Sequence, residues 1–188
     1  SQNISSCQKL FRHVTQKRQL FTAVTTMEKI TFLVKKLQSS ASSNPNLTDL
    51  VFLKGEFFSW DHTTHTITFN PSDPLANAYL LHEFGHALLG HADYSHDIEL
   101  LQIERAAWDK AVKIAKEYEV SLDSDTVEDS LDTYRDWLHD RSLCPKCSAT
   151  GIQIGALVYR CVACNASWRV NEARNCALRR YSTKKRSL

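Results

Sequence analysis

The chain has 188 residues, of which 43% are hydrophobic and 23% charged, as in an ordinary globular domain. No run of about 18 apolar residues occurs, which excludes a transmembrane helix from the expectations. The net charge is only +2, but Asp73 to Asp140 holds 16 acidic and 5 basic residues, whereas Arg141 to the end holds 10 basic residues and one acid. This asymmetry indicates an appended basic module.

The N-terminal part predicts one helix and a small β unit. Residues 8–38 repeat apolar side chains at helical spacing, and residues 39–46 (SSASSNPN) have the composition of a loop. The segments LVFLKGEFFSW (50–60) and TTHTITFN (63–70) predict two strands, as a hairpin or in a small sheet. The second segment is either a strand that pairs with an extended substrate or an ordinary edge or core strand.

Three further helices are expected. The first begins at PSDP, with Ser72 or Asp73 as N-cap and Pro74 at the first helical position, and ends at Gly90. The others cover about 98–118 and 126–140.

The segment YLLHEFGHALLGH (79–91) places three histidines and a glutamate in an apolar run. An unpaired polar group in an apolar interior costs roughly 2–7 kcal/mol, so these side chains need partners. His82 and His86 are four residues apart, hence on one helix face, and can share a Zn²⁺. Glu83 is the candidate catalytic base. Two core histidines without a metal are the alternative.

A catalytic zinc needs a third protein ligand and an open position. The candidates follow the HExxH motif: His91, Asp93, His96, Asp97, Glu99 and Glu104. His91 lies about 140° around the helix from His86, off the metal-facing side. Glu104 falls in the apolar stripe of the next helix and Glu99 on its polar side, so we predict Glu104 as the third ligand. A buried glutamate paired with Arg or Lys is the alternative.

Peptide hydrolysis would also require a donor to the oxyanion. The candidates are His62, His65, Tyr94 and His96, and the sequence does not choose between them.

Two Cys-x-x-Cys pairs, separated by 13 residues, have the spacing of a zinc ribbon: Cys144, Cys147, Cys161 and Cys164. We predict that they hold a structural zinc, with two redox pairs as the alternative. Together with the lone Cys7 and Cys176, these pairs favour a reducing compartment, hence the cytoplasm.

Trp168 is expected to pack on the ribbon, with stacking on a base or a peptide as the alternative. The surrounding arginines indicate contact with a nucleic acid or an acidic protein: Arg160, Arg169, Arg174, Arg179 and Arg180. A solvated surface is the competing interpretation.

The segments LLHEFGHALLGH and ERAAWDKA resemble the ImmA/IrrE family of metallopeptidases, over about residues 50–118. The predicted set of His82, His86 and Glu104 looks like a gluzincin-type site. The resemblance implies an α+β, zincin-like core with a small β-sheet, a cytoplasmic setting and proteolysis of a regulatory protein such as a transcriptional repressor.

The sequence thus predicts a zincin-like metallopeptidase domain at 1–140, a zinc ribbon at 141–170 and a basic tail at 171–188. The expected function is a zinc endopeptidase with one catalytic and one structural Zn²⁺ per chain. A SprT-like, DNA-associated protease is an alternative, because such proteins combine HExxH with a zinc ribbon, but they use a third histidine. A non-catalytic zinc-binding regulator that contacts nucleic acid or protein is the other.

Overall fold

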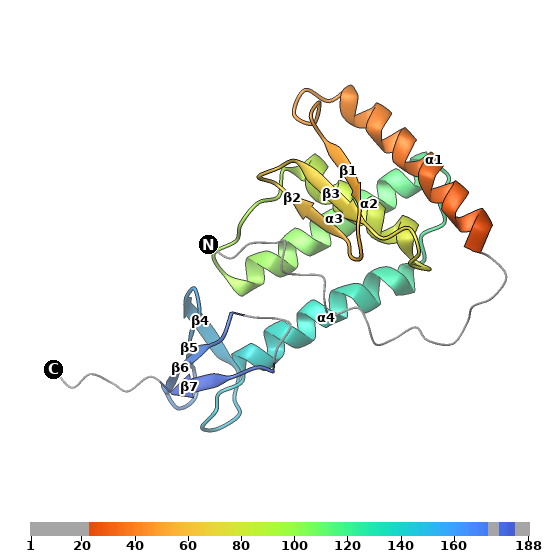
Figure 1. Cartoon of the computed structure of the whole chain (residues 1–188). Helices are drawn as coiled ribbons and strands as arrows, with labels where there is room; N and C mark the ends of the chain where they lie inside the picture. The colour runs from red at the N-terminus through yellow and green to blue at the C-terminus, as the bar shows by residue number, and fades with distance from the viewer. Residues whose placement is uncertain (1–22, 173–176, 183–188) are drawn as a thin grey trace.

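The computed structural model describes residues 23–172 and 177–182. This part of the chain confirms the α+β class, with four helices and two small sheets (Figure 1). The elements are α1 (Ala23–Ser42), β1 (Val51–Lys54), β2 (Ser59–Asp61), β3 (Thr66–Phe69), α2 (Ala76–Leu89), α3 (Asp97–Glu117), α4 (Ser124–Ser142), β4 (Gly151–Gly155), β5 (Val158–Cys161), β6 (Ser167–Val170) and β7 (Arg180–Ser182). No helix among the described residues is long and apolar enough to cross a membrane.

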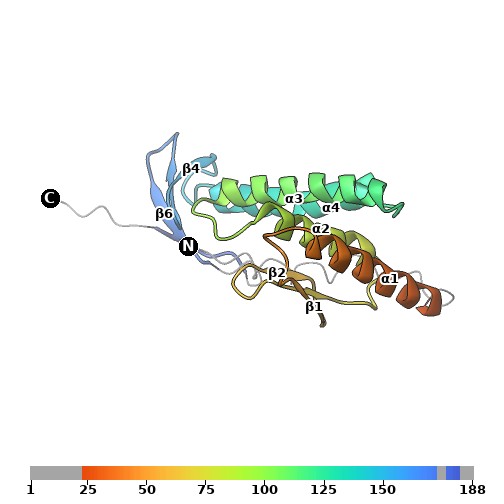
Figure 2. The ribbon, with the colours of Figure 1, turned by 90° about the horizontal axis from the view of Figure 1, so that it is seen from above.

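Helix α2 lies in the middle of the larger part of the molecule. Figure 2 shows α3 and α4 on one side of it, and the β1–β3 sheet and α1 on the other. Most α2 residues between Ala76 and Ala87 are buried, including the whole HEFGH segment. A helix that is apolar on all sides is buried in a core, so its few polar side chains need hydrogen-bonding or charged partners inside the protein.

The first sheet has the strand order β1-β3-β2, with β1 parallel and β2 antiparallel to β3. The segment 50–60, predicted as one strand, therefore forms two strands that flank β3. Strand β3 is central and pairs on both edges, so the suggestion that it pairs with an extended substrate is wrong: its backbone groups are already bonded. Ile67 and Phe69 are buried while Thr66 and Thr68 are half-buried, as the alternation predicts.

Helix α1 extends to Ser42, into the segment predicted as a loop. The hydroxyl of Ser42 donates to the carbonyl oxygen of Gln38 (2.9 Å), so the polar side chains bond back onto the helix instead of ending it. Residues 8–22 of the predicted helix lie outside the described residues.

Helix α2 begins two residues later than predicted. The Asp73 carboxylate accepts a hydrogen bond from the backbone N–H of Leu75 (2.8 Å), which makes a turn around Pro74 before the helix starts. Gly90 ends the helix as predicted, in the left-handed conformation (φ 63°).

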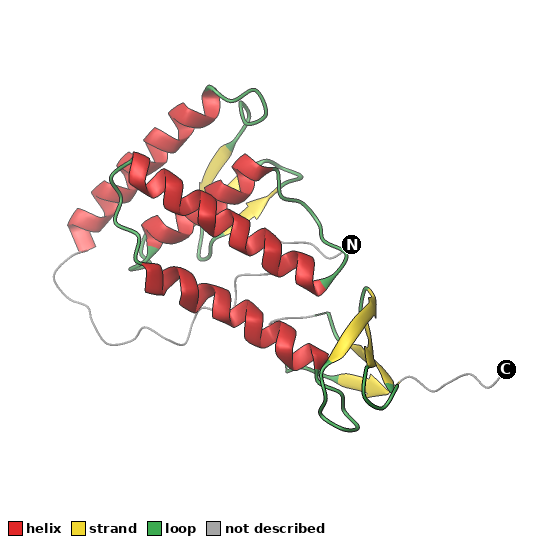
Figure 3. Cartoon of the chain, turned by 180° about the vertical axis from the view of Figure 1, so that it is seen from behind, coloured by secondary structure: helices red, strands yellow, loops and turns green. Residues whose placement is uncertain are grey.

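Helices α3 and α4 agree with the predicted ranges within two residues at each end. Figure 3 shows that the start of α3 and the end of α4 lie at the same end of the molecule, beside the ribbon.

The ribbon is a four-stranded antiparallel sheet in the order β4-β5-β6-β7 with its own buried cluster. Strand β7 comes from residues 180–182, within the segment that the sequence analysis counted as a basic tail.

A buried ion pair joins the ribbon to the helices. The Asp97 carboxylate at the start of α3 accepts hydrogen bonds from the Arg141 guanidinium at the end of α4 (Nε–Oδ2 2.5 Å, Nη2–Oδ1 3.3 Å). The Tyr159 hydroxyl of β5 donates to the same carboxylate, and the Asp97 N–H donates to the Gln153 side chain of β4 (2.7 Å). Asp97, Arg141 and Tyr159 are all at most 1% exposed. We call these three residues the joint.

The joint holds the ribbon by backbone groups as well. The Arg141 guanidinium donates to the carbonyl oxygen of Asn171 (2.7 Å), and the Trp168 indole donates to the carbonyl oxygen of Arg141 (3.0 Å). Burial and the hydrogen bond to the Asp97 carboxylate raise the pKa of the Tyr159 hydroxyl, so it remains a donor.

We predict that Asp97→Ala destabilises the protein by about 3–5 kcal/mol, because it leaves the Arg141 guanidinium buried without its partner. Urea unfolding of the full chain measures the change. Asp109→Ala, which removes one of the two exposed partners of Arg105, is the matched control and should cost less than about 1 kcal/mol. Equal effects of the two substitutions would contradict the importance of the joint.

Candidate metal centres

Close packing between α2 and α3 brings the predicted ligands together. At Gly85 the helices leave no room for a side chain, since a Cβ there would lie 2.6 Å from the carbonyl oxygen of Ala107. Glu104 lies about one turn before Ala107 on the same face of α3. The contact therefore determines how far Glu104 stands from the imidazoles of α2.

Three ligand atoms converge in this buried space. His82 Nε2 lies 3.1 Å from His86 Nε2 and 3.0 Å from Glu104 Oε2, and His86 Nε2 lies 3.5 Å from the same oxygen. Ligands at 2.0–2.1 Å from a tetrahedral zinc stand about 3.3 Å apart, so the set fits that ion. The three side chains are buried and could hold a metal ion.

The charges of the group also suit a cation. Burial would raise the pKa of Glu104, but the positive charge of His86 and the hydrogen bond with His82 outweigh it and hold the pKa well below its usual value. Burial lowers the pKa of His82 to about 4, whereas for His86 the Glu104 carboxylate outweighs burial and raises the pKa. The Glu104 carboxylate thus lies against two imidazoles in an apolar interior, where a metal ion would supply the balancing positive charge.

Glu83 lies beside the ligand group and is 3% exposed. Burial raises its pKa to about 8, against the opposing effects of the His86 charge and of a hydrogen bond from the backbone N–H of Trp60 in β2. A carboxyl with a pKa near neutrality can both accept and return a proton.

His91 lies behind the ligands and is not one of them, as predicted, but the reason differs: α2 ends at Leu89, and the left-handed Gly90 turns the chain before His91. Its Nδ1 is 3.0 Å from Nδ1 of His86, on the opposite side of that ring from the ligand atom. Burial and the charge of His86 lower the pKa of His91 to about 4, so its ring stays neutral and its Nδ1 can accept a hydrogen bond from the Nδ1–H of His86. Such a partner fixes the orientation of a ligating imidazole. The Trp60 indole in turn donates to the carbonyl oxygen of His91 (2.9 Å).

The other candidates for the third ligand lie elsewhere. Asp93 is exposed, and Asp97 belongs to the joint. Glu99 and His96 form a capping box at the start of α3, where the Glu99 carboxylate accepts from two backbone N–H groups. Of the six candidates, Glu104 alone joins the two imidazoles among the described residues.

The candidates for the oxyanion donor lie in two places: His62 and His65 line one hollow, and Tyr94 and His96 lie near the start of α3. The His65 ring bonds Asp49 (2.7 Å), and His96 belongs to the capping box. Tyr94 is buried in a small cluster near the start of α3, and His62 lines a hollow beside the end of α2. The assignment of this role stays a prediction.

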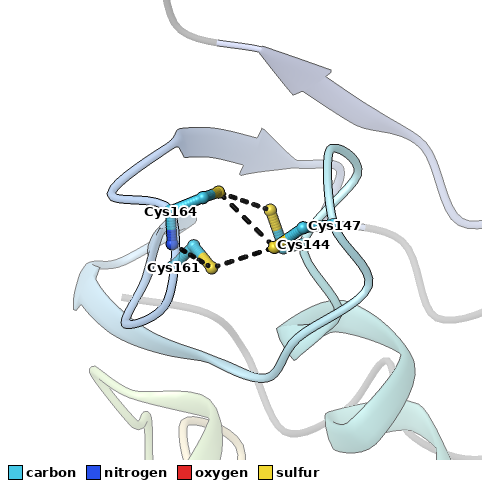
Figure 4. Close-up of side chains that lie close together, drawn as sticks. All are labelled: Cys144, Cys147, Cys161 and Cys164. Atoms are coloured by element: carbon cyan, nitrogen blue, oxygen red, sulfur yellow. Dashed lines mark hydrogen bonds between the residues drawn. The ribbon is translucent and has the colours of Figure 1, made fainter.

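The four ribbon cysteines form a second group, shown in Figure 4. Their Sγ atoms meet between the two Cys-x-x-Cys pairs: Cys144 lies 3.7 Å from Cys164, and Cys147 lies 3.5 Å from both Cys161 and Cys164. Thiolates at 2.3 Å from a tetrahedral zinc stand about 3.8 Å apart. Contacts between the pairs favour one four-ligand site over two separate redox pairs.

Backbone donors support thiolate character in the ribbon. The N–H groups of Cys164 and Ala163 donate to the Cys161 sulfur and lower the pKa of this thiol, whereas contacts with the other sulfurs raise the pKa of Cys147. A zinc site binds the thiolate form, so these donors favour metal binding.

Trp168 packs inside the ribbon as predicted, with its ring centroid 5.6 Å from that of Tyr159. It is fully buried, so the alternative of stacking on a base or a peptide is wrong. Arg174 and the lone cysteines, Cys7 and Cys176, lie outside the described residues.

Two contacts around the sites were missed in the sequence. The Trp60 N–H that bonds Glu83 is a backbone group, and no residue type signals it. The stacking of Trp108 on the His82 ring (centroids 4.3 Å apart) had a signal, because Trp108 lies four residues after Glu104 on the same face of α3.

Comparison with protein-family models, with curated proteins and with solved structures gives no match to this chain.

We predict that Glu104→Gln weakens zinc binding at the His82–His86–Glu104 site by more than about 100-fold, because it removes the only carboxylate of the three ligands. Loss of a residue that merely hydrogen-bonds a metal ligand typically weakens binding about 10- to 100-fold. Competition with a chromophoric chelator measures the affinity. Glu99→Gln removes the same charge from the same helix and should leave the affinity unchanged. The reverse result would refute the choice of Glu104.

Gly85→Ala tests the helix contact. The added methyl group must push α3 away, so we expect a loss of about 1–3 kcal/mol in unfolding free energy together with weaker zinc binding. Gly90→Ala has open space but keeps a left-handed backbone, which costs about 1–2 kcal/mol. Gly90→Ala should therefore lower the free energy of unfolding and leave the zinc affinity unchanged. Unchanged zinc affinity in Gly85→Ala would show that this contact does not position Glu104.

Proposed function

We propose that this protein is a zinc-dependent endopeptidase that cleaves a regulatory protein, such as a transcriptional repressor. The observation that carries the proposal is the buried Glu83 carboxyl beside the His82–His86–Glu104 group. A purely structural metal site has no use for a proton acceptor at that position.

His82, His86 and Glu104 would hold the zinc, and three protein ligands are the number that catalytic sites use. When bound, zinc lowers the pKa of water towards 7 and polarises a carbonyl oxygen. Glu83 takes the proton from the attacking water and returns it to the leaving amine. Zinc held by these residues would lower the pKa of Glu83 and would favour the carboxylate form that accepts this proton. The Trp60 N–H holds the carboxylate in place.

The substrate class rests on the resemblance of LLHEFGHALLGH and ERAAWDKA to the ImmA/IrrE family. Members of this family cleave repressors or related regulators, and we extend that substrate class to this chain. We also infer a reducing compartment, such as the cytoplasm, because the four ribbon thiolates must stay reduced to hold zinc.

A SprT-like, DNA-associated protease is the second candidate, and the four-cysteine ribbon is the observation that favours it. Its third histidine ligand has no counterpart in the group around Glu104, because His91 contacts the back of His86. We therefore prefer the gluzincin-like assignment.

Glu83→Gln tests the catalytic proposal. Because it removes the general base but none of the ligands, we expect cleavage to fall by about 10²–10⁴ while both zinc ions stay bound. Cleavage is measured by mass spectrometry on a proteome-derived peptide library, and zinc by elemental analysis. Equal cleavage by both proteins would show that Glu83 is not the general base, whereas no cleavage by the zinc-loaded wild type would favour a non-catalytic regulator.

A further inference from the structure

The ribbon sheet has one buried and one open face. Side chains alternate across a strand, and Tyr159 and Trp168 lie on the buried face. The opposite side, which we call the outer face, carries Ile152, Val158, Arg160, Ser167, Arg169 and Tyr181.

The buried face is the one that the rest of the protein uses. Tyr159 donates to Asp97 in the joint, and Trp168 donates to the backbone of Arg141. The ribbon lies at one end of the molecule, beyond α3 and α4 (Figure 3). On the outer face, Ile152, Arg160, Arg169 and Tyr181 are exposed among the residues that the structure describes.

The outer face is positively charged. Arg160 and Arg169 are exposed, and within the described part of the chain neither guanidinium forms an ion pair. Residues 143–171 contain no aspartate or glutamate. Arg160 pairs with Ser167 and Arg169 with Val158, so the arginines are diagonal neighbours, about 7–8 Å apart at the backbone.

A partly exposed hydrophobic side chain stands next to each of the two cations. Tyr181 lies opposite Arg169 on β7 and is 52% exposed, and Ile152 lies opposite Arg160 on β4 and is 56% exposed. Because Trp168 is buried, Tyr181 is the aromatic ring that this face offers to a partner.

We infer that the outer face binds single-stranded nucleic acid. The two guanidiniums contact neighbouring phosphates, and Tyr181 stacks on an unpaired base, the combination that single-strand binding surfaces use. An acidic peptide would need only the arginines and would leave Tyr181 and Ile152 unused. A duplex hides the base faces that such side chains contact. This inference does not depend on peptidase activity.

Fluorescence anisotropy of the zinc-loaded full chain with labelled oligothymidylate of about 16 nucleotides tests the inference. Arg160→Gln/Arg169→Gln should weaken binding at least tenfold and reduce the slope of log affinity against log salt by about 1.4, for two phosphate contacts. Tyr181→Ala should weaken binding about fivefold or more at an unchanged salt slope, and Tyr181→Phe should bind like wild type.

Lys113→Gln/Lys116→Gln, which removes two exposed charges from α3, is the matched control and should bind like wild type. Circular dichroism and zinc content confirm that each variant is folded. The inference fails if the arginine pair has no more effect than the lysine pair, or if Tyr181→Ala changes nothing. It also fails if a labelled oligoglutamate or a DNA duplex of equal charge binds as tightly as the single strand.

Discussion

A buried carboxylate has to be matched by a buried cation, and α3 meets this requirement twice. Asp97 starts the helix and is matched by Arg141, whereas Glu104, seven residues later on the same side, meets the imidazoles of His82 and His86, where a metal ion would supply the cation. Breaking either match would leave a charge in an apolar interior, where it costs several kcal/mol. The two matches fix α3 against α4 and the ribbon at one point, and against α2 at the other.

This arrangement makes α3 the element shared by both candidate metal centres. Asp97, the first residue of α3, bonds β4 and β5, the strands that connect the first cysteine pair to Cys161. The middle of α3 supplies Glu104. Gly85 sets the distance between α3 and α2, so a small residue next to a predicted ligand matters as much as the ligand. The ribbon is thereby anchored to α3, the helix that supplies Glu104. The anchoring side chains, Asp97, Arg141 and Tyr159, belong to neither ligand group.

Features that depend on spacing along one element could be predicted from the sequence. The pair His82 and His86, the inward face of Glu104 and the grouping of the cysteines all follow from short, regular intervals. Features that depend on partners far away in the sequence could not be predicted. Asp97 is an ordinary polar residue in sequence, and its partners, Arg141 and Tyr159, lie 44 and 62 residues away. Strand order has the same limit, because the central place of β3 depends on which strands reach it.

The distance in sequence between Asp97 and its partners has a consequence for the order of folding. Strands β4 to β7 pair with their neighbours along the chain, and α3 and α4 are joined by a short connection, so both cores grow from contacts that close small loops. The joint closes much longer loops, and its charges lose their water only at that moment. We therefore expect the joint to form late, between two cores that already exist, which makes its closure the step that commits the chain to one native arrangement.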